Sequence, residues 1–214
     1  MSTVQVILLL IILMVIGLFN LLIDHRKLIE KHNFASEYLS RFQQFKNSYR
    51  TDFDGETYYW LTNRVSKIQS NLGFFGIMLN YQPAFSNYIH KSYQIIVNTL
   101  PEMRNMRADS SMINACEDAL IRYIGFLDDA CENSINQIKN PFKWLKTGVQ
   151  SIISLPFFIL YWLGLISSSF LEKIINNSIL KLISGFIAII GFIASIISII
   201  LGWETFVRLI QNLL

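Results

Sequence analysis

The chain has 214 residues, of which 52% are hydrophobic and only 15% are charged, and its formal net charge is +3. Its mean hydropathy is +0.40, and the apolar residues are concentrated toward the two ends of the sequence. This composition is typical of a membrane protein, and it excludes the possibility that the whole chain is one water-soluble domain.

The first apolar segment, residues 4–23, contains no charged side chain, and only Gln5 and Asn20 in it are strongly polar. About 20 apolar residues in a helix are needed to cross a bilayer core of about 30 Å. The segment lacks the positively charged start and the small-residue cleavage site of a secretion signal. We therefore expect a transmembrane helix that is retained in the protein.

Residues 24–147 are expected to form one helical domain, because about 120 residues suffice for a compact domain. The residues 51–56, TDFDGE, are expected to form a turn or the start of a helix. Gly73, Gly76 and Pro83 are expected to interrupt regular structure. Apolar residues at helical spacing predict helices over 24–49, 57–72 and 84–100, the last ending at Pro101.

The clearest helical pattern follows, where apolar and small residues recur at steps of three and four and so share one helix face. Ser110 or Ser111 is expected to cap the start of this helix, and Asn140-Pro141 to end it. Its two cysteines are expected to be free thiols, since the cytoplasm is reducing. The face consists of Ile113, Cys116, Leu120, Tyr123, Leu127, Cys131, Ser134 and Ile138.

Charge divides within this domain. Residues 25–107 hold eleven lysines and arginines against six acidic residues, whereas residues 109–132 hold six acidic residues against one arginine. We expect the two parts to face each other in places, within a subunit or between subunits. The alternative is two ordinary solvated helix faces.

Two further uncharged segments follow the domain, residues 149–171 and residues 182–202, and each is long enough to cross a bilayer. The first contains Pro156 and predicts a kinked span or a helix lying in the headgroup region. Residues 203–214 are expected to form an amphipathic tail. The expected fold is thus an all-α membrane protein with three transmembrane helices, one N-terminal and two C-terminal.

Positive charges flank the domain on both sides, and such charges mark the cytoplasmic side of a membrane. The sequence therefore predicts a multi-pass membrane protein with its N-terminus outside and with residues 24–147 and the C-terminus in the cytoplasm. The charges are Arg26, Lys27, Lys31, Lys139, Lys143 and Lys146.

Small residues form a stripe along the last apolar segment, at steps of 4, 3, 4, 3 and 4. Small residues allow helices to approach closely in lipid. The stripe is expected either to seat another span of the same subunit or to surround an axis in an oligomer, where serine hydroxyls would line a pore. Its members are Ser184, Ala188, Gly191, Ser195, Ser198 and Gly202.

Signatures of known catalytic sites are almost absent, so neither an enzyme, a cofactor nor a metal site is expected. The run DDACE at 128–132 has the form of a magnesium–diphosphate motif, which leaves a membrane-bound diphosphate-using enzyme as a remote alternative. A solvated acidic face is the more common use of such a run. His25 and His32 predict a polar face near the membrane, and His90 stands alone.

Basic and aromatic residues interleave between Arg41 and Lys91. Aromatic planes stack on nucleobases, and lysine or arginine neutralises phosphates, so this set predicts a site for a nucleotide or a short oligonucleotide. The alternative is that the aromatics form the helical core while the cations are solvated. The candidate ligand-binding residues are Arg41, Lys46, Arg50, Tyr58, Trp60, Arg64 and Lys67.

The size, the predicted topology, the aromatic–basic region and the small-residue span together resemble the small membrane effectors of bacterial anti-phage defence. The plan is similar to that of the membrane effector of the Hailong system. The resemblance implies abortive infection by an oligomeric ion channel that a single-stranded DNA oligomer, made by a partner nucleotidyltransferase, holds shut. The resemblance concerns the general arrangement of the whole chain, and no sequence motif is shared.

The function expected from the sequence is an oligomeric membrane effector, with four subunits as the expected number. Its cytoplasmic domain senses a nucleotide or short oligonucleotide, and its spans form a ligand-controlled pore or disrupt the inner membrane. The alternative is a non-conducting membrane anchor or scaffold that recruits a soluble partner.

Overall fold

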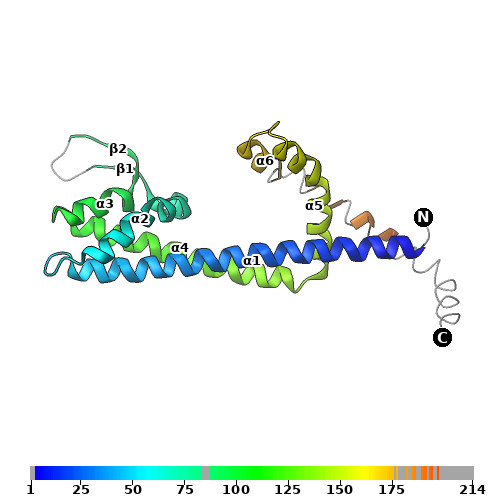
Figure 1. Cartoon of the computed structure of the whole chain (residues 1–214), viewed down its shortest axis with the longest axis horizontal. Helices are drawn as coiled ribbons and strands as arrows, with labels where there is room; N and C mark the ends of the chain where they lie inside the picture. The colour runs from blue at the N-terminus through cyan, green and yellow to red at the C-terminus, as the bar shows by residue number, and fades with distance from the viewer. Residues whose placement is uncertain are drawn as a thin grey trace. The chain divides into compact units, whose positions relative to one another are not determined.

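A computed structural model of the protein describes residues 3–82 and 87–175, together with residues 177, 182, 185, 186, 189–191, 193, 194 and 197. The chain divides into two compact units. The central unit comprises residues 26–132, and the terminal unit comprises residues 1–25 and 133–214. Both are built mainly of α-helices, as predicted (Figure 1).

Helix α1 (Thr3–Ser48) is 46 residues long and joins the predicted first span to the helix expected after it. In the described part of the chain it is the one helix that is long and apolar enough to cross a membrane. The prediction of a long helix from the first apolar segment into the domain is confirmed.

Helix α2 (Gly55–Leu72) agrees with the predicted helix over 57–72. Asp54 caps it, because the Asp54 carboxylate accepts a hydrogen bond of 2.9 Å from the backbone N–H of Thr57. A 3₁₀ turn, η1 (Gly73–Gly76), ends it, and Gly73 adopts a positive φ of 50° that favours glycine.

A β-hairpin follows, where the sequence predicted irregular structure and then a helix over 84–100. Strand β1 (Ile77–Tyr81) pairs antiparallel with β2 (His90–Gln94). Helix α3 begins only at Ile95 and runs through Pro101 to Arg104. The predicted helix is therefore wrong at both ends. Leu100 and Met103 are buried on either side of Pro101, so tertiary packing holds the helix across the proline.

Helix α4 (Ser110–Ile138) confirms the predicted long helix. Most of its predicted face is buried, and Cys131 and Ile138 are half-buried. The cap differs from the prediction, because the Asp109 carboxylate, rather than Ser110 or Ser111, accepts from the Ser111 backbone N–H at 3.4 Å.

The core of the central unit lies between α1, α2, α3 and α4, and Figure 1 shows α1 and α4 side by side there. Its largest fully buried side chains include Tyr38, Phe42 and Phe45 of α1 and Leu120 of α4. The basic and acidic parts of the domain face each other here in two places, as expected. Lys46 lies 2.7 Å from Glu117, and His32 lies 2.9 Å from Asp128.

In the terminal unit, α1 crosses helix α5 (Pro141–Trp162) at two glycines. A Cβ on Gly17 would overlap the carbonyl oxygen of Trp144, and a Cβ on Gly148 would overlap the carbonyl oxygen of Leu13. Beside the crossing, the Asn20 amide donates a hydrogen bond of 2.7 Å to the Ser151 hydroxyl. The two helix backbones are thus in direct contact, as small residues permit.

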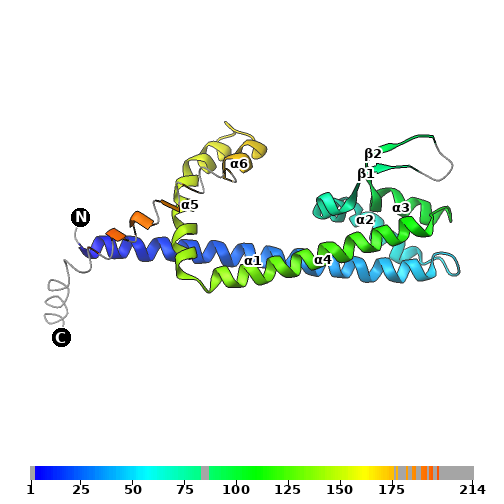
Figure 2. The same cartoon turned by 180° about the vertical axis from the view of Figure 1, so that it is seen from behind.

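The helix predicted over 149–171 has different bounds in the structure. Asn140 caps α5 and Pro141 occupies its first turn, so α5 starts eight residues before Val149. It ends at Trp162, and Gly164, with φ of 74°, turns the chain. Helix α6 (Ser168–Ile175) then lies back beside the end of α5 (Figure 2).

The predicted third span, 182–202, lies mostly outside the described residues, and the tail 203–214 lies wholly outside them. Of the small-residue stripe, only Gly191 is described, and it is helical. The roles predicted for Ser184, Ala188, Ser195, Ser198 and Gly202 fall outside the described residues.

Candidate ligand site

Three of the predicted ligand-binding residues form one array on α1 and α2. The guanidinium carbon of Arg41 lies 4.5 Å from the centroid of the Trp60 ring, and that of Arg64 lies 4.4 Å from it. Arg41 also contacts Glu37 at 3.1 Å. The Trp60 ring, which was expected to stack on a base, is therefore stacked by the protein's own cations.

The other four predicted residues make separate contacts. Lys46 is bound by Glu117, Lys67 lies 4.4 Å from the ring centroid of Phe34, Arg50 lies over Tyr49 at 5.3 Å, and Tyr58 packs on Phe45 at 5.5 Å. None of the seven predicted residues lines the cavity described below. Their part in ligand binding stays a prediction.

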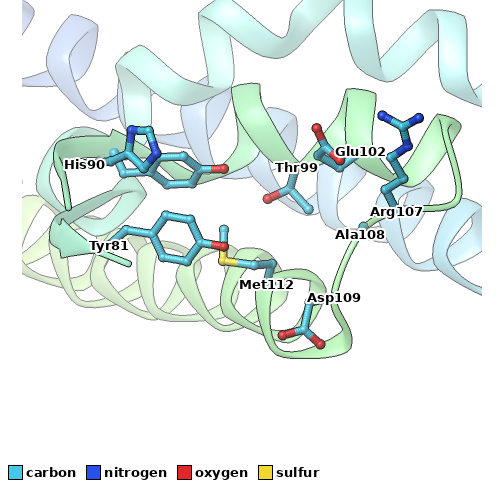
Figure 3. A pocket seen from close by; sticks show the side chains of 9 residues that line it. Tyr81, His90, Thr99, Glu102, Arg107, Ala108, Asp109 and Met112 are labelled. Atoms are coloured by element: carbon cyan, nitrogen blue, oxygen red, sulfur yellow. The ribbon is translucent and has the colours of Figure 1, made fainter. Parts of the chain in front are cut away.

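A cavity of about 420 Å³ lies in the central unit, between the hairpin, α3 and the start of α4 (Figure 3). Its volume is within the range of about 300–1,000 Å³ that small-molecule sites occupy. Figure 3 shows Tyr81 and His90 on one side of it, Glu102 and Arg107 on the other, and Thr99 between them. Its lining is Tyr81, His90, Tyr93, Thr99, Glu102, Arg107, Ala108, Asp109 and Met112.

Three aromatic rings of the hairpin form one wall of the cavity. The ring centroids of Tyr81 and Tyr93 are 4.4 Å apart. The His90 ring lies 6.3 Å from Tyr81 and 5.9 Å from Tyr93. We call these three residues the aromatic wall.

A regular hairpin would bring Tyr81 and His90 together, because they pair directly, but it would not add Tyr93 to them. Tyr93 pairs with Met78, and Tyr81 lies three residues beyond Met78 on the same strand. Residues three apart on a strand point to opposite faces. Ser92 breaks the alternation with a left-handed φ of 54°, which costs a non-glycine residue roughly 1–2 kcal/mol. Such strain occurs preferentially at functional sites.

Thr99 contributes a buried hydroxyl to the cavity. The residue is 2% exposed, and within the described part of the chain its hydroxyl has no nitrogen or oxygen partner. The neighbouring group is the thiol of Cys116, a weak hydrogen-bonding group. Burial raises the pKa of the Cys116 thiol to about 12, and the contact with Thr99 acts in the opposite direction. Figure 3 shows the Thr99 hydroxyl directed toward the side of the cavity where Tyr81 lies.

The charged residues of the lining differ in how they are engaged. The Asp109 carboxylate accepts a hydrogen bond of 2.6 Å from the Ser111 hydroxyl, and such bonds to Ser111 lower the Asp109 pKa. Burial raises the Tyr93 pKa, as do the charges of Tyr81 and Glu102. Among the described residues, no hydrogen bond or ion pair engages the Arg107 guanidinium.

Few of the residues that line this cavity could be predicted from the sequence. Tyr81 lies in the interleaved aromatic–basic stretch, but His90 stood alone in the sequence, and Thr99 and Arg107 carried no pattern. The left-handed backbone at Ser92, which assembles the wall, occurs at a residue type that gives no signal for it.

The acidic run at 128–132 shows no metal-binding arrangement. Asp128 is contacted by His32 at 2.9 Å. Within the described ranges no three histidine, cysteine or acidic residues cluster closely enough to hold a metal ion. Comparison of the chain with models of protein families, with curated proteins and with solved structures finds no match.

Proposed function

We propose that the protein is a membrane effector controlled by a ligand. Its central unit binds the ligand in the cytoplasm, and its terminal unit, as a homo-oligomer, forms a pore or disrupts the inner membrane. The observation that carries the proposal is the cavity of about 420 Å³, with its strained aromatic wall, in a chain whose first helix is long enough to cross a membrane.

The terminal unit supports a membrane location by the side chains that it leaves uncovered. Water would be an unfavourable environment for this surface, whereas lipid or other copies of the chain would cover it at little cost. Large apolar side chains between 46% and 63% exposed include Leu8, Ile12, Val15 and Phe19 of α1 and Ile152, Leu155, Phe158 and Ile159 of α5.

Ion flux tests the proposal directly. The purified chain, reconstituted in liposomes, should release or admit ions, and the flux should change when nucleotides or short single-stranded DNA are added. If the small-residue stripe lines the pore, Ser195→Asp should shift selectivity toward cations. Asn63→Asp, which adds the same charge to an exposed position of α2, should not. Wild-type liposomes without flux under every condition would contradict the pore.

The alternative, a non-conducting anchor that recruits a soluble partner, is favoured by a different observation. The central unit exposes several large apolar side chains from α2 to the hairpin: Tyr59 at 71%, Phe74 at 75%, Leu79 at 64%, Tyr88 at 77% and Ile89 at 59%. Exposed apolar groups of this kind occur at protein interaction sites. Absence of flux from wild type, with a stoichiometric soluble protein copurifying unless Phe74 and Leu79 are replaced by serine, would favour this function.

A further inference from the structure

We propose that the cavity beside the aromatic wall binds a nucleoside monophosphate, either free or as the end of an oligonucleotide, with the base against the wall and the phosphate at Arg107. This inference rests on the proposed function, because it assigns a site and a ligand class to the sensing unit. It moves the ligand away from the seven residues that the sequence suggested.

The wall is suited to a flat ring. Tyr81 and Tyr93 pack on each other at 4.4 Å with an interplanar angle of 36°, and His90 adjoins both. Rings this close overlap face to face, so each tyrosine covers one face of the other, and the pair does not surround a small cation as an ammonium-binding cage would. A planar base that lies on an uncovered outer face of this pair extends the stack, and such stacking depends little on which base it is.

Polar groups opposite the wall match the edge of a base. The Thr99 hydroxyl is buried without a strong partner, and such a group gains more from a ligand hydrogen bond than an exposed hydroxyl does. Glu102, also in the lining, offers a carboxylate that accepts from ring N–H or amino groups. At the Trp60 array the ring is already covered by the guanidinium groups of Arg41 and Arg64.

The charge of the lining favours a ligand with few phosphates. Arg107 is the single arginine or lysine of the lining, whereas Glu102 and Asp109 are both acidic. A guanidinium binds a phosphate through paired N–H donors. A triphosphate would bring further negative charge near the two carboxylates, where like charges repel. We therefore expect monophosphates to bind more tightly than the corresponding triphosphates.

Isothermal titration of the full chain in mild detergent tests the site. The probes are the four ribonucleoside monophosphates, adenosine, ATP and a tetradeoxyadenylate. At least one monophosphate should bind saturably with one site per chain, and the triphosphate should bind at least about tenfold more weakly. Competition between AMP and the tetradeoxyadenylate would identify a strand end as a source of the ligand.

Matched variants locate the binding. Thr99→Val keeps the side-chain volume, and it should keep the fold while weakening binding about tenfold or more. Tyr81→Leu should weaken binding at least as much, whereas Tyr59→Leu, which removes an exposed tyrosine from α2, should not. Arg107→Gln should weaken binding of the monophosphate and leave binding of adenosine unchanged. Arg104→Gln, which lies outside the lining, should change the binding of neither.

The outcomes separate the site from the function. No saturable binding of any probe at millimolar concentration, or binding unaffected by Thr99→Val and Tyr81→Leu, overturns the site. Flux that responds to nucleotide in the Tyr81→Leu variant as in wild type would keep the proposed function and reject this cavity. Binding that depends on Thr99 and Arg107, without any flux, would keep the cavity and reject the pore.

Discussion

The contact between α1 and α5 predicts that one methyl group on Gly17 will weaken the terminal unit. The added Cβ would overlap the Trp144 carbonyl oxygen and lie 2.7 Å from the backbone nitrogen of Gly148. Both obstacles belong to the backbone, so no side-chain rotation relieves them and the two helices must separate. Overpacking of this kind costs about 1–3 kcal/mol.

Separation also weakens the contacts around the crossing. A gap of about 1 Å forfeits up to about half of the dispersion attraction between facing atoms, here between Leu145 and Val149 of α5 and the apolar side chains of α1. It would also stretch the 2.7 Å hydrogen bond from Asn20 to Ser151, a type worth about 0.6 kcal/mol in lipid. We expect Gly17→Ala to destabilise the unit by roughly 2–4 kcal/mol in all.

Thermal unfolding in mild detergent, followed by tryptophan fluorescence, measures this effect, because Trp144 lies at the crossing. Gly17→Ala should lower the midpoint by on the order of 5–15 °C. Gly125→Ala is the matched control, since a Cβ there meets nothing within 4 Å, and alanine in an exposed helix stabilises by about 0.5–1 kcal/mol. If Gly17→Ala unfolds at or above the wild-type temperature, the backbone contact is refuted.

Three further outcomes are expected. Trp60→Ala should destabilise the central unit by about 3 kcal/mol in chemical unfolding, because two cation contacts and core packing are lost. Tyr59→Ala should change the free energy of unfolding by less than about 0.5 kcal/mol, and equal effects of the two variants would contradict the Trp60 array. The hydrogen-bonded lysine and glutamine lower the Glu117 pKa, so Glu117→Gln should cost about 1 kcal/mol at pH 7. This cost should begin to shrink as pH falls below the unfolded value of about 4.3 and should be lost as pH falls through the lower folded pKa. A cost that does not decrease between about pH 7 and about pH 3 would reject the ion pair. A thiol reagent at pH 8 should modify the half-buried Cys131 in the native protein. It should modify Cys116 only after unfolding, because burial raises the pKa of that thiol to about 12. Modification of both thiols in the native state would contradict the burial of Cys116.

The long helices were predictable because their signal is periodic. The stripe from Ile113 to Ile138 repeats over many turns, and packing within the central unit buries most of it. Asp54 and Asn140 act as caps at positions where the sequence suggested a helix start and a helix end. Caps and helical periodicity depend on residues only a few positions apart, so they can be recognised without knowing the tertiary contacts.

The hairpin and its cavity were not predictable for the opposite reason. The stretch from residue 84 to residue 100 has helical spacing, and the pairing of His90 with Tyr81 depends on a partner strand nine residues earlier. Arg41, Arg64 and Lys67 were expected to neutralise the phosphates of a ligand, whereas in the structure they lie over aromatic rings of the same chain. Composition shows which groups are present, and only the three-dimensional packing shows which groups are already satisfied.

The left-handed backbone of a single residue, Ser92, distinguishes this hairpin from a regular one. Returning Ser92 to the extended region would restore regular alternation and move Tyr93 to the opposite face, which would dismantle the aromatic wall. The strain of roughly 1–2 kcal/mol shifts the balance between the two hairpins by about 5- to 30-fold toward the regular one. A molecule that binds only the assembled wall stabilises the strained form by RT ln(1 + L/Kd), where L is its free concentration. A concentration of about 5 to 30 times Kd would therefore offset the whole strain. Binding at this position would therefore stabilise the strained hairpin as well as fill the cavity.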